Sequence, residues 1–318
     1  MSAENILALI EDCAGKSTLG DFSQYLAKMC GRGQKKWMIF SDYVLDDDTK
    51  PNDVFAFTVF PYFVHFDDLK GAFATAAPRD IKKTREVTAE MIRAMRSEWL
   101  FNWAFVFSGR YRLFGSNAVD ERKNLVSGLD VASRMVKDWQ SNVQNPPSSW
   151  KHFLEKLEAM KQELQKNSPN MKLMRSICLT AIFGGYIMYL VIKHAQPEIV
   201  GWFSDRDNIL SYCDGIVFDL LGSNQHGLCE RDGISRSAKI IIATPDAQGP
   251  NWYDEMLRVP DYLAGTLADW NRSTNDISKE KFVKIVEDVL ADNRNLSIFE
   301  FKLNAAQWTC GRVAIEKR

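Results

Sequence analysis

The chain has 318 residues, of which 46% are hydrophobic and 25% are charged, and its 40 basic and 41 acidic side chains give a formal net charge of −1. This composition is ordinary for a soluble globular protein that is long enough to bury a full core in one or two domains. The near-neutral charge excludes nucleic-acid binding through overall charge, so such a surface has to be a local basic patch.

The cysteines and histidines carry no strong site signal. The six cysteines are scattered without a CxxC pair, and Met1 opens no signal peptide, which predicts a reduced, cytoplasmic compartment. His226 and Cys229 have no second ligand pair, so we expect no zinc site there. The uncharged run 176–192 is at the short limit for a membrane span, and a buried helix is the preferred interpretation over a membrane anchor.

The first third of the chain reads as a helical lead-in followed by a hairpin. Residues 1–35 have helical periodicity, and the continuous apolar run in 36–44 predicts a buried strand. The acidic, proline-containing turn 46–53 separates it from a second strand over 54–63, its expected hairpin partner. Helices are expected over 67–76 and 81–99, followed by a third strand over 100–107.

The rest of the chain predicts a helical insertion and then a return of the α/β pattern. Three helical stretches occupy the insertion, and strands at 198–203 and 238–243 follow it, each with a helix after it. Pro260 suits the first turn of the last of these helices. A helix over 279–291 and strands over 296–303 and 308–315 end the chain. The predicted segments are a lead-in (1–35), a first core part (36–117), the helical insertion (118–196), a second core part (197–275) and a C-terminal extension (276–318).

Acidic residues end or follow three of these strands. Asp42 lies near the end of the first strand, Asp205 and Asp207 follow the fourth, and Asp261 follows the fifth on its helix. The order of elements is compatible with an α/β, ribonuclease-H-like mixed sheet flanked by helices, in which such acids converge. Clustered carboxylates bind divalent cations, so Mg²⁺ or Mn²⁺ is the expected cofactor.

Each acid also has a purely structural interpretation. Asp42 could be a hairpin turn residue, and Asp205 and Asp207 could cap the following helix. Asp261 could complement the positive end of its own helix. The pattern therefore predicts a shared site without proving that the acids meet in space.

Four short motifs resemble a known family. The run 39–42 before a second strand, Asp80 with Lys82, the acids at 205–207, and residues 259–265 resemble the ribonuclease-H-like proteins of bacteria and mobile elements grouped as domain-of-unknown-function family 3800. The resemblance spans 36–110 and 198–270. It implies that Asp80 joins the metal ligands and that Lys82 pairs with phosphate. Tyr43 stands where these relatives keep Glu.

The preferred function is divalent-metal-dependent cleavage of nucleic-acid phosphodiesters. A basic helix face would support it by following a phosphate backbone, although a solvated helix face explains the same residues equally well; these are Lys82, Lys83, Arg85, Arg93 and Arg96. One alternative is a non-catalytic module, or a defence or toxin component, that binds a protein partner through the insertion. Another alternative is a hydrolase that acts on nucleotides. No membrane partner is expected.

Overall fold

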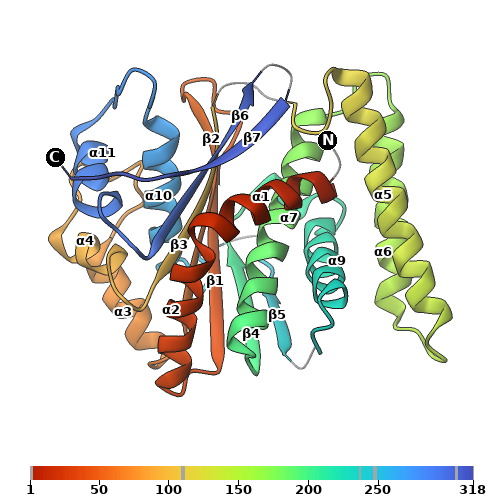
Figure 1. Ribbon diagram of the computed structural model, residues 1–318, viewed down its shortest axis with the longest axis horizontal. Helices are drawn as coiled ribbons and strands as arrows, with labels where there is room; N and C mark the ends of the chain where they lie inside the picture. Colours follow the sequence, from red (N-terminus) through yellow and green to blue (C-terminus); the bar gives the residue numbers. More distant parts are fainter. Residues whose placement is uncertain (1–2, 109–111, 236–237, 246–248, 305–306, 318) are drawn as a thin grey trace. The chain divides into compact units, whose positions relative to one another are not determined.

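The computed structural model describes residues 3–108, 112–235, 238–245, 249–304 and 307–317 (Figure 1). In this part of the chain, seven strands form one mixed sheet with the order β5-β4-β1-β2-β3-β6-β7. The strands are β1 (Lys36–Val44), β2 (Asn52–Pro61), β3 (Phe101–Ser108), β4 (Ile199–Ser204), β5 (Lys239–Ala243), β6 (Leu296–Asn304) and β7 (Gln307–Val313).

Helices flank this sheet, so the predicted α/β class with a mixed sheet and helices is confirmed. The helices are α1 (Ala3–Ser17), α2 (Leu19–Gly31), α3 (Phe66–Ala76), α4 (Ala89–Met95), α5 (Ala118–Ser141), α6 (Ser148–Gln165), α7 (Met171–Ala195), α8 (Asn208–Ser211), α9 (Ile216–Arg231), α10 (Arg258–Asp269) and α11 (Glu280–Ile285), which continues into the π-helical turn η1 (Val286–Leu290).

The chain divides into two compact units. Unit 1 contains residues 1–9, 112–189 and 206–235, and unit 2 contains residues 10–111, 190–205 and 236–318. Unit 1 takes most of the predicted insertion but also α8 and α9, which the sequence analysis assigned to the core. One physical reason is a bond within unit 1, where Lys156 on α6 lies 2.9 Å from Asp219 on α9.

The uncharged run forms part of α7. Among the described helices, α7 is long and apolar enough to cross a membrane, and 89% of its most apolar window is buried inside the protein. This extent of burial agrees with the interpretation of the run as a buried helix.

Unit 2 contains the whole sheet, and its strand pairing sets the geometry of the site. β1 pairs antiparallel with β2 and parallel with β4, and β2 pairs antiparallel with β3. The predicted hairpin of β1 and β2 is therefore confirmed, with Asp42 opposite Ala56. Since β1 and β4 run parallel, their carboxyl ends lie side by side, with Ser41 next to Ser204.

The two faces of the sheet are covered differently. On β1, Met38, Phe40 and Val44 join the buried cluster formed with α3, α4, α10 and α11, which lie together on one side of the sheet (Figure 1). Alternate residues point to the opposite face, where Trp37 contacts Tyr25 of α2 with ring centroids 5.9 Å apart. Even-numbered residues of β1 therefore face the α10 side.

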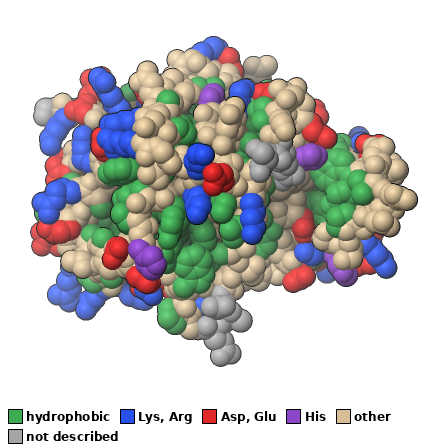
Figure 2. Space-filling model, turned by 90° about the horizontal axis from the view of Figure 1, so that it is seen from below, with side chains coloured by type: hydrophobic (Ala, Val, Ile, Leu, Met, Phe, Trp, Pro, Cys, Tyr) green, Lys and Arg blue, Asp and Glu red, His purple; other side chains and the backbone are tan. Residues whose placement is uncertain are grey.

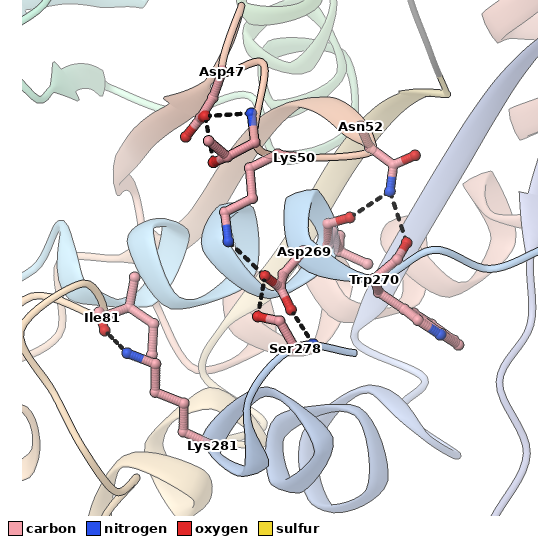
Figure 3. Close-up of polar contacts among 10 residues, drawn as sticks. Asp47, Lys50, Asn52, Ile81, Asp269, Trp270, Ser278 and Lys281 are labelled. Carbon is pink, nitrogen blue, oxygen red and sulfur yellow. Dashed lines mark hydrogen bonds and ion pairs between the residues drawn. The ribbon is translucent and has the colours of Figure 1, made fainter. Parts of the chain in front are cut away.

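Polar contacts join the hairpin to the C-terminal end of α10 (Figure 3). The side-chain amide of Asn52 donates to the carbonyls of Leu267 and Trp270, both at 2.8 Å, which supplies partners at a helix end that lacks internal ones. Lys50 forms an ion pair of 2.5 Å with the buried Asp269. These bonds hold one end of α10 against the β1–β2 turn.

The prediction of one helix over 81–99 is wrong for much of its length. The structure has only α4 there, because Thr88 caps its start by accepting the backbone N–H of Met91 at 3.0 Å. Upstream, the N–H of Ile81 donates to the Asp261 carboxylate at 2.8 Å. Residues 77–88 are therefore a turn segment and not a helix, with local bonds from the N–H groups of Lys83 and Thr84 to the carbonyl of Asp80.

Candidate functional site

Three of the predicted acids lie on the α10 side of the sheet. Asp42 shares its face with Phe40, two positions earlier on β1. Asp205 follows the last residue of β4 in the same alternation as Phe203, which is buried in the same cluster. Asp261 lies in the first turn of α10. The alternation along each strand is the local reason why these carboxyls come together.

Asp42 and Asp261 interact with each other. The two carboxyl groups are close enough to share a side-chain hydrogen bond once one of them carries a proton. Burial, followed by the charges of Asp261 and Asp205, raises the pKa of Asp42 well above its ordinary value. Burial raises the pKa of Asp261 as well, against the opposing effects of the Ile81 N–H and of Arg258. Arg258 therefore compensates the charge of this pair only in part.

Asp205 is the solvent-exposed acid next to Asp42 and Asp261. Its backbone N–H lies 3.4 Å from the carbonyl of Ser41, which places it beside Asp42 across the two parallel strands. Its charge acts on both Asp42 and Asp261, and its side chain is exposed to solvent. The acidic group, which we define as Asp42, Asp205 and Asp261, is thus reachable from solvent.

Asp80 has a different set of partners. It forms ion pairs with Arg258, the first residue of α10, and with Lys83 at 3.2 Å. Arg258 also acts electrostatically on Asp261. Asp80 therefore lies next to the acidic group through a shared arginine, and its negative charge is already balanced in this structure.

Asp207 has the structural role that the sequence left open. Its side chain accepts the N–H of Ile209 at 2.8 Å and caps α8. It belongs to unit 1, whereas Asp205 belongs to unit 2. Of the two candidates after β4, the structure therefore joins Asp205 to Asp42 and Asp261.

Tyr43 faces away from the acidic group. Its hydroxyl lies 2.8 Å from Ser41 Oγ and 3.3 Å from Ser204 Oγ, on the opposite face of β1 from Asp42. A carboxylate at position 43 would point to that opposite face too. The absence of Glu at this position therefore removes no ligand from the α10 side.

The predicted basic helix face separates into two sets of residues. On α4, Arg93 pairs with Glu90 at 2.6 Å, and Arg96, just beyond the helix, donates to the carbonyl of Ala291 at 2.8 Å. Lys82 and Arg85 instead lie on the turn segment, where they are exposed and have no ion pair within the described part of the chain. Among the described residues on the face in Figure 2, Lys and Arg side chains alternate with acidic and hydrophobic ones and form no continuous strip.

The chemistry of the acidic group fits a hard cation. Its donors are carboxylate oxygens only, which Mg²⁺ and Mn²⁺ prefer. Within the described residues, no group of three or more acidic, His or Cys side chains is already arranged around a common metal position. The side chains of Asp42 and Asp261 interact with each other, and a cation bound by both would take the place of a proton between them.

Two cationic residues around the acidic group, Arg258 and Lys281, were not predicted from the sequence. Arg258 stands three positions before Asp261 on the same helix, a spacing that could have indicated a neighbour on one helix face. Lys281 is buried and donates to the carbonyls of Ile81 and Thr84, and nothing in the local sequence indicates these partners. Both contacts depend on segments that are distant in the chain.

Comparison with known proteins gives no functional information on the acidic group. No protein-family model, no curated protein and no solved structure matches the chain.

Gly265 sets how closely α10 approaches the turn segment. A Cβ at this position would lie 2.8 Å from Cγ2 of Ile81, a stiff branched side chain whose N–H binds Asp261. We expect Gly265→Ala to destabilise the protein by about 1 kcal/mol, because overpacking of about 1–3 kcal/mol exceeds the helical gain of about 1 kcal/mol. Chemical denaturation measures the change.

Gly128 provides the control for this substitution. It lies within α5, and nothing stands within 4 Å of an added Cβ. Gly128→Ala should therefore stabilise the protein by up to about 1 kcal/mol. Equal effects of the two substitutions would contradict the proposed close approach of α10 to Ile81.

Proposed function

We propose that the protein is a divalent-metal-dependent hydrolase of nucleic-acid phosphodiesters, with Asp42, Asp205 and Asp261 as cation ligands. The observation that carries this proposal is that three acids, from β1, the end of β4 and α10, act electrostatically on one another, and that one of them, Asp205, is exposed to solvent. Mg²⁺ or Mn²⁺ held there would polarise a phosphoryl oxygen and activate a water molecule.

The strand arrangement supports a ribonuclease-H-like core. An antiparallel meander of β1, β2 and β3 continues on the other side of β1 with the parallel strands β4 and β5. In the arrangement that the sequence predicts, acids on the first strand, the fourth strand and a later helix converge. We therefore propose the ribonuclease-H-like assignment, and the resemblance to family 3800, as the framework of the site.

The electrostatics of the acidic group favour a cation as its natural partner. Burial raises the pKa of both Asp42 and Asp261, and the charges of the neighbouring acids add to this rise, so ionising both carboxyls is costly. A divalent cation removes this cost, whereas a monovalent side chain removes only part of it. Arg258 is already paired with Asp80, so it provides Asp261 with incomplete compensation.

A polymer suits the site better than a free nucleotide. Asp205 is exposed, and Asp42, Asp205 and Asp261 are not among the residues that line an apolar cavity between β2, α3 and α4. Lys82 and Arg85, exposed on the turn that contacts Asp261 through Ile81, are the proposed contacts to phosphates of the chain. We propose Asp80 as the charge partner of Arg258 and not as a fourth ligand.

The test is a cleavage assay on single- and double-stranded DNA and RNA with Mn²⁺, Mg²⁺ or a chelator. We expect metal-dependent cleavage by the wild type, and a loss of at least about 10²-fold for Asp205→Asn because a charged ligand is removed. Product formation on denaturing gels measures both.

Asp207→Asn is the matched control, since Asn caps a helix as well as Asp does. This variant should retain wild-type cleavage. If Asp205→Asn and Asp207→Asn are equally active, Asp205 is not a ligand. If the wild type cleaves none of the substrates with either metal, the proposal fails and the non-catalytic binding module becomes the better explanation.

A further inference from the structure

A buried lysine lies behind the turn that contacts Asp261. Lys281 of α11 is only 5% exposed, and its ammonium group donates to the carbonyl of Thr84 at 2.7 Å and to the carbonyl of Ile81. Figure 3 shows Lys281 pointing toward the carbonyl of Ile81. The same residue, Ile81, donates its N–H to Asp261 Oδ2 at 2.8 Å.

We propose that Lys281 is a positioning residue that fixes the Asp261 carboxylate through the backbone of Ile81. Lys281 restrains the carbonyl of Ile81, and the N–H of Ile81 restrains Asp261. This inference rests on the proposed function, because it assigns Lys281 to the support of a cation ligand. Outer partners of this kind orient ligands and affect metal affinity strongly.

The cost of burying the lysine supports a specific role. Burial lowers the pKa of Lys281, and the nearby charges of Lys279 and Lys50 lower it further. A buried ammonium group is unfavourable unless its donors are bonded. Here its bonds go to two carbonyls of one turn, and its charge also acts on Asp261. An apolar side chain would fill the same space without either interaction.

Other contacts of the turn hold the neighbours of Ile81: Arg258 pairs with Asp80, and the hydroxyl of Tyr262 donates to the carbonyl of Arg79. Residues 77–88 form no helix that would hold Ile81 by its own hydrogen bonds. Gly265 allows the side chain of Ile81 to lie against α10, but packing alone does not orient a peptide group. The Lys281 and Asp261 contacts act on the two polar ends of the residue.

The first arm of the test is amide hydrogen exchange of Ile81 in the metal-free protein. We expect Lys281→Met to accelerate exchange at Ile81 by about 10-fold or more, because the opened turn no longer protects this amide, while strand amides keep their protection. Lys284→Met is the matched control. Lys284 lies one turn later and donates to the carbonyl of Val87, at 3.3 Å, in the same segment.

The second arm measures the consequence for the cation. Lys281→Met should weaken Mn²⁺ binding by about 10-fold, measured by calorimetry, and should lower kcat for cleavage while the KM for nucleic acid stays unchanged. Lys284→Met should leave both near the wild-type values. If Lys281→Met fails to fold, Lys281→Gln, whose shorter side chain does not reach the carbonyl of Ile81, takes its place.

The outcomes separate this inference from the proposed function. Unchanged exchange at Ile81 in the Lys281 variant, or equal acceleration in the Lys284 variant, would overturn the positioning role. A wild type that binds no Mn²⁺ and cleaves nothing would overturn the proposed function, and the exchange arm would still decide whether Lys281 holds Ile81.

Discussion

Replacement of Asp42 by Asn is expected to abolish metal-dependent cleavage and to stabilise the metal-free protein at neutral pH. Activity should fall by at least about 10²-fold, because a proposed cation ligand that interacts with both other acids loses its charge. Stability should rise by about 1 kcal/mol, since the amide of Asn can donate to Asp261 where two carboxylates repel each other. Cleavage assays and chemical denaturation in a chelating buffer measure the two effects.

The sign of the stability change follows from the direction of the pKa shift. The pKa of Asp42 is raised on folding, by burial first and then by Asp261 and Asp205. Asp42 therefore costs stability that grows as the pH rises from its unfolded-state pKa, about 4, to its folded-state pKa, and acidification below this window removes the cost. The gain from Asp42→Asn should shrink as the solution is acidified and should disappear when Mn²⁺ saturates the wild type, because bound metal stabilises the folded state.

Asp47 supplies a control of opposite sign. Bonds from the side chain and backbone of Thr49 lower the pKa of Asp47 on the exposed β1–β2 turn. Asp47→Asn should slightly reduce stability at neutral pH and leave cleavage unchanged. If Asp42→Asn also reduced stability at neutral pH, the ionised Asp42 side chain would stabilise the fold, which would contradict the expected cost of its burial.

Removal of the cation at Lys50 is expected to destabilise the protein by about 3 kcal/mol, because it leaves Asp269 buried without its charge partner. The Asp269 side chain is only 4% exposed, and Lys50 lies 2.5 Å from it. Lys50→Met keeps most of the apolar stem and isolates this charge effect. Thermal and chemical denaturation measure the loss.

The pH dependence of this loss has a definite direction. Burial alone would raise the pKa of Asp269, but the bonds from Lys50 and Ser278 outweigh it and hold the pKa below its ordinary value. The stability from Asp269 is therefore present above its unfolded-state pKa and is lost as the pH falls below about 4. The difference between wild type and Lys50→Met should fade over the same range.

An exposed ion pair provides the comparison. Lys16 and Asp12 lie 2.6 Å apart, but their side chains are 73% and 66% exposed. Lys16→Met should change stability by less than about 0.5 kcal/mol at any pH. A Lys50 effect of this small size would mean that the contact between the β1–β2 turn and the end of α10 does not fix the helix.

Several elements follow from the sequence because their signals are local. The predicted first strand over 36–44 coincides with β1, since its continuous apolar run needs burial on both faces. The acidic turn after it predicts the hairpin that the structure forms. Alternation along a strand also places Asp42 on the face of Phe40, so the sequence determined on which side of the sheet this acid would lie.

Other features depend on contacts between distant segments. The helix predicted over 81–99 forms only over Ala89–Met95, because Ile81 bonds to Asp261 and Lys281 in place of helical partners. The apolar spacing before Ala89 resembles a helix because Ile81 and Val87 are both buried, although this segment is not helical. Tertiary hydrogen bonds outweigh such a weak local preference.

The sequence by itself determined the α/β class, the β1–β2 hairpin and the placing of acids at strand ends, because periodicity and turn chemistry act over a few residues. Only the tertiary structure decided that Asp205 joins Asp42 and Asp261 while Asp207 caps α8. It also decided that Arg258 and Lys281 lie around the group. Electrostatic and hydrogen-bond partners depend on distances between segments far apart in the chain, and no local pattern encodes those distances.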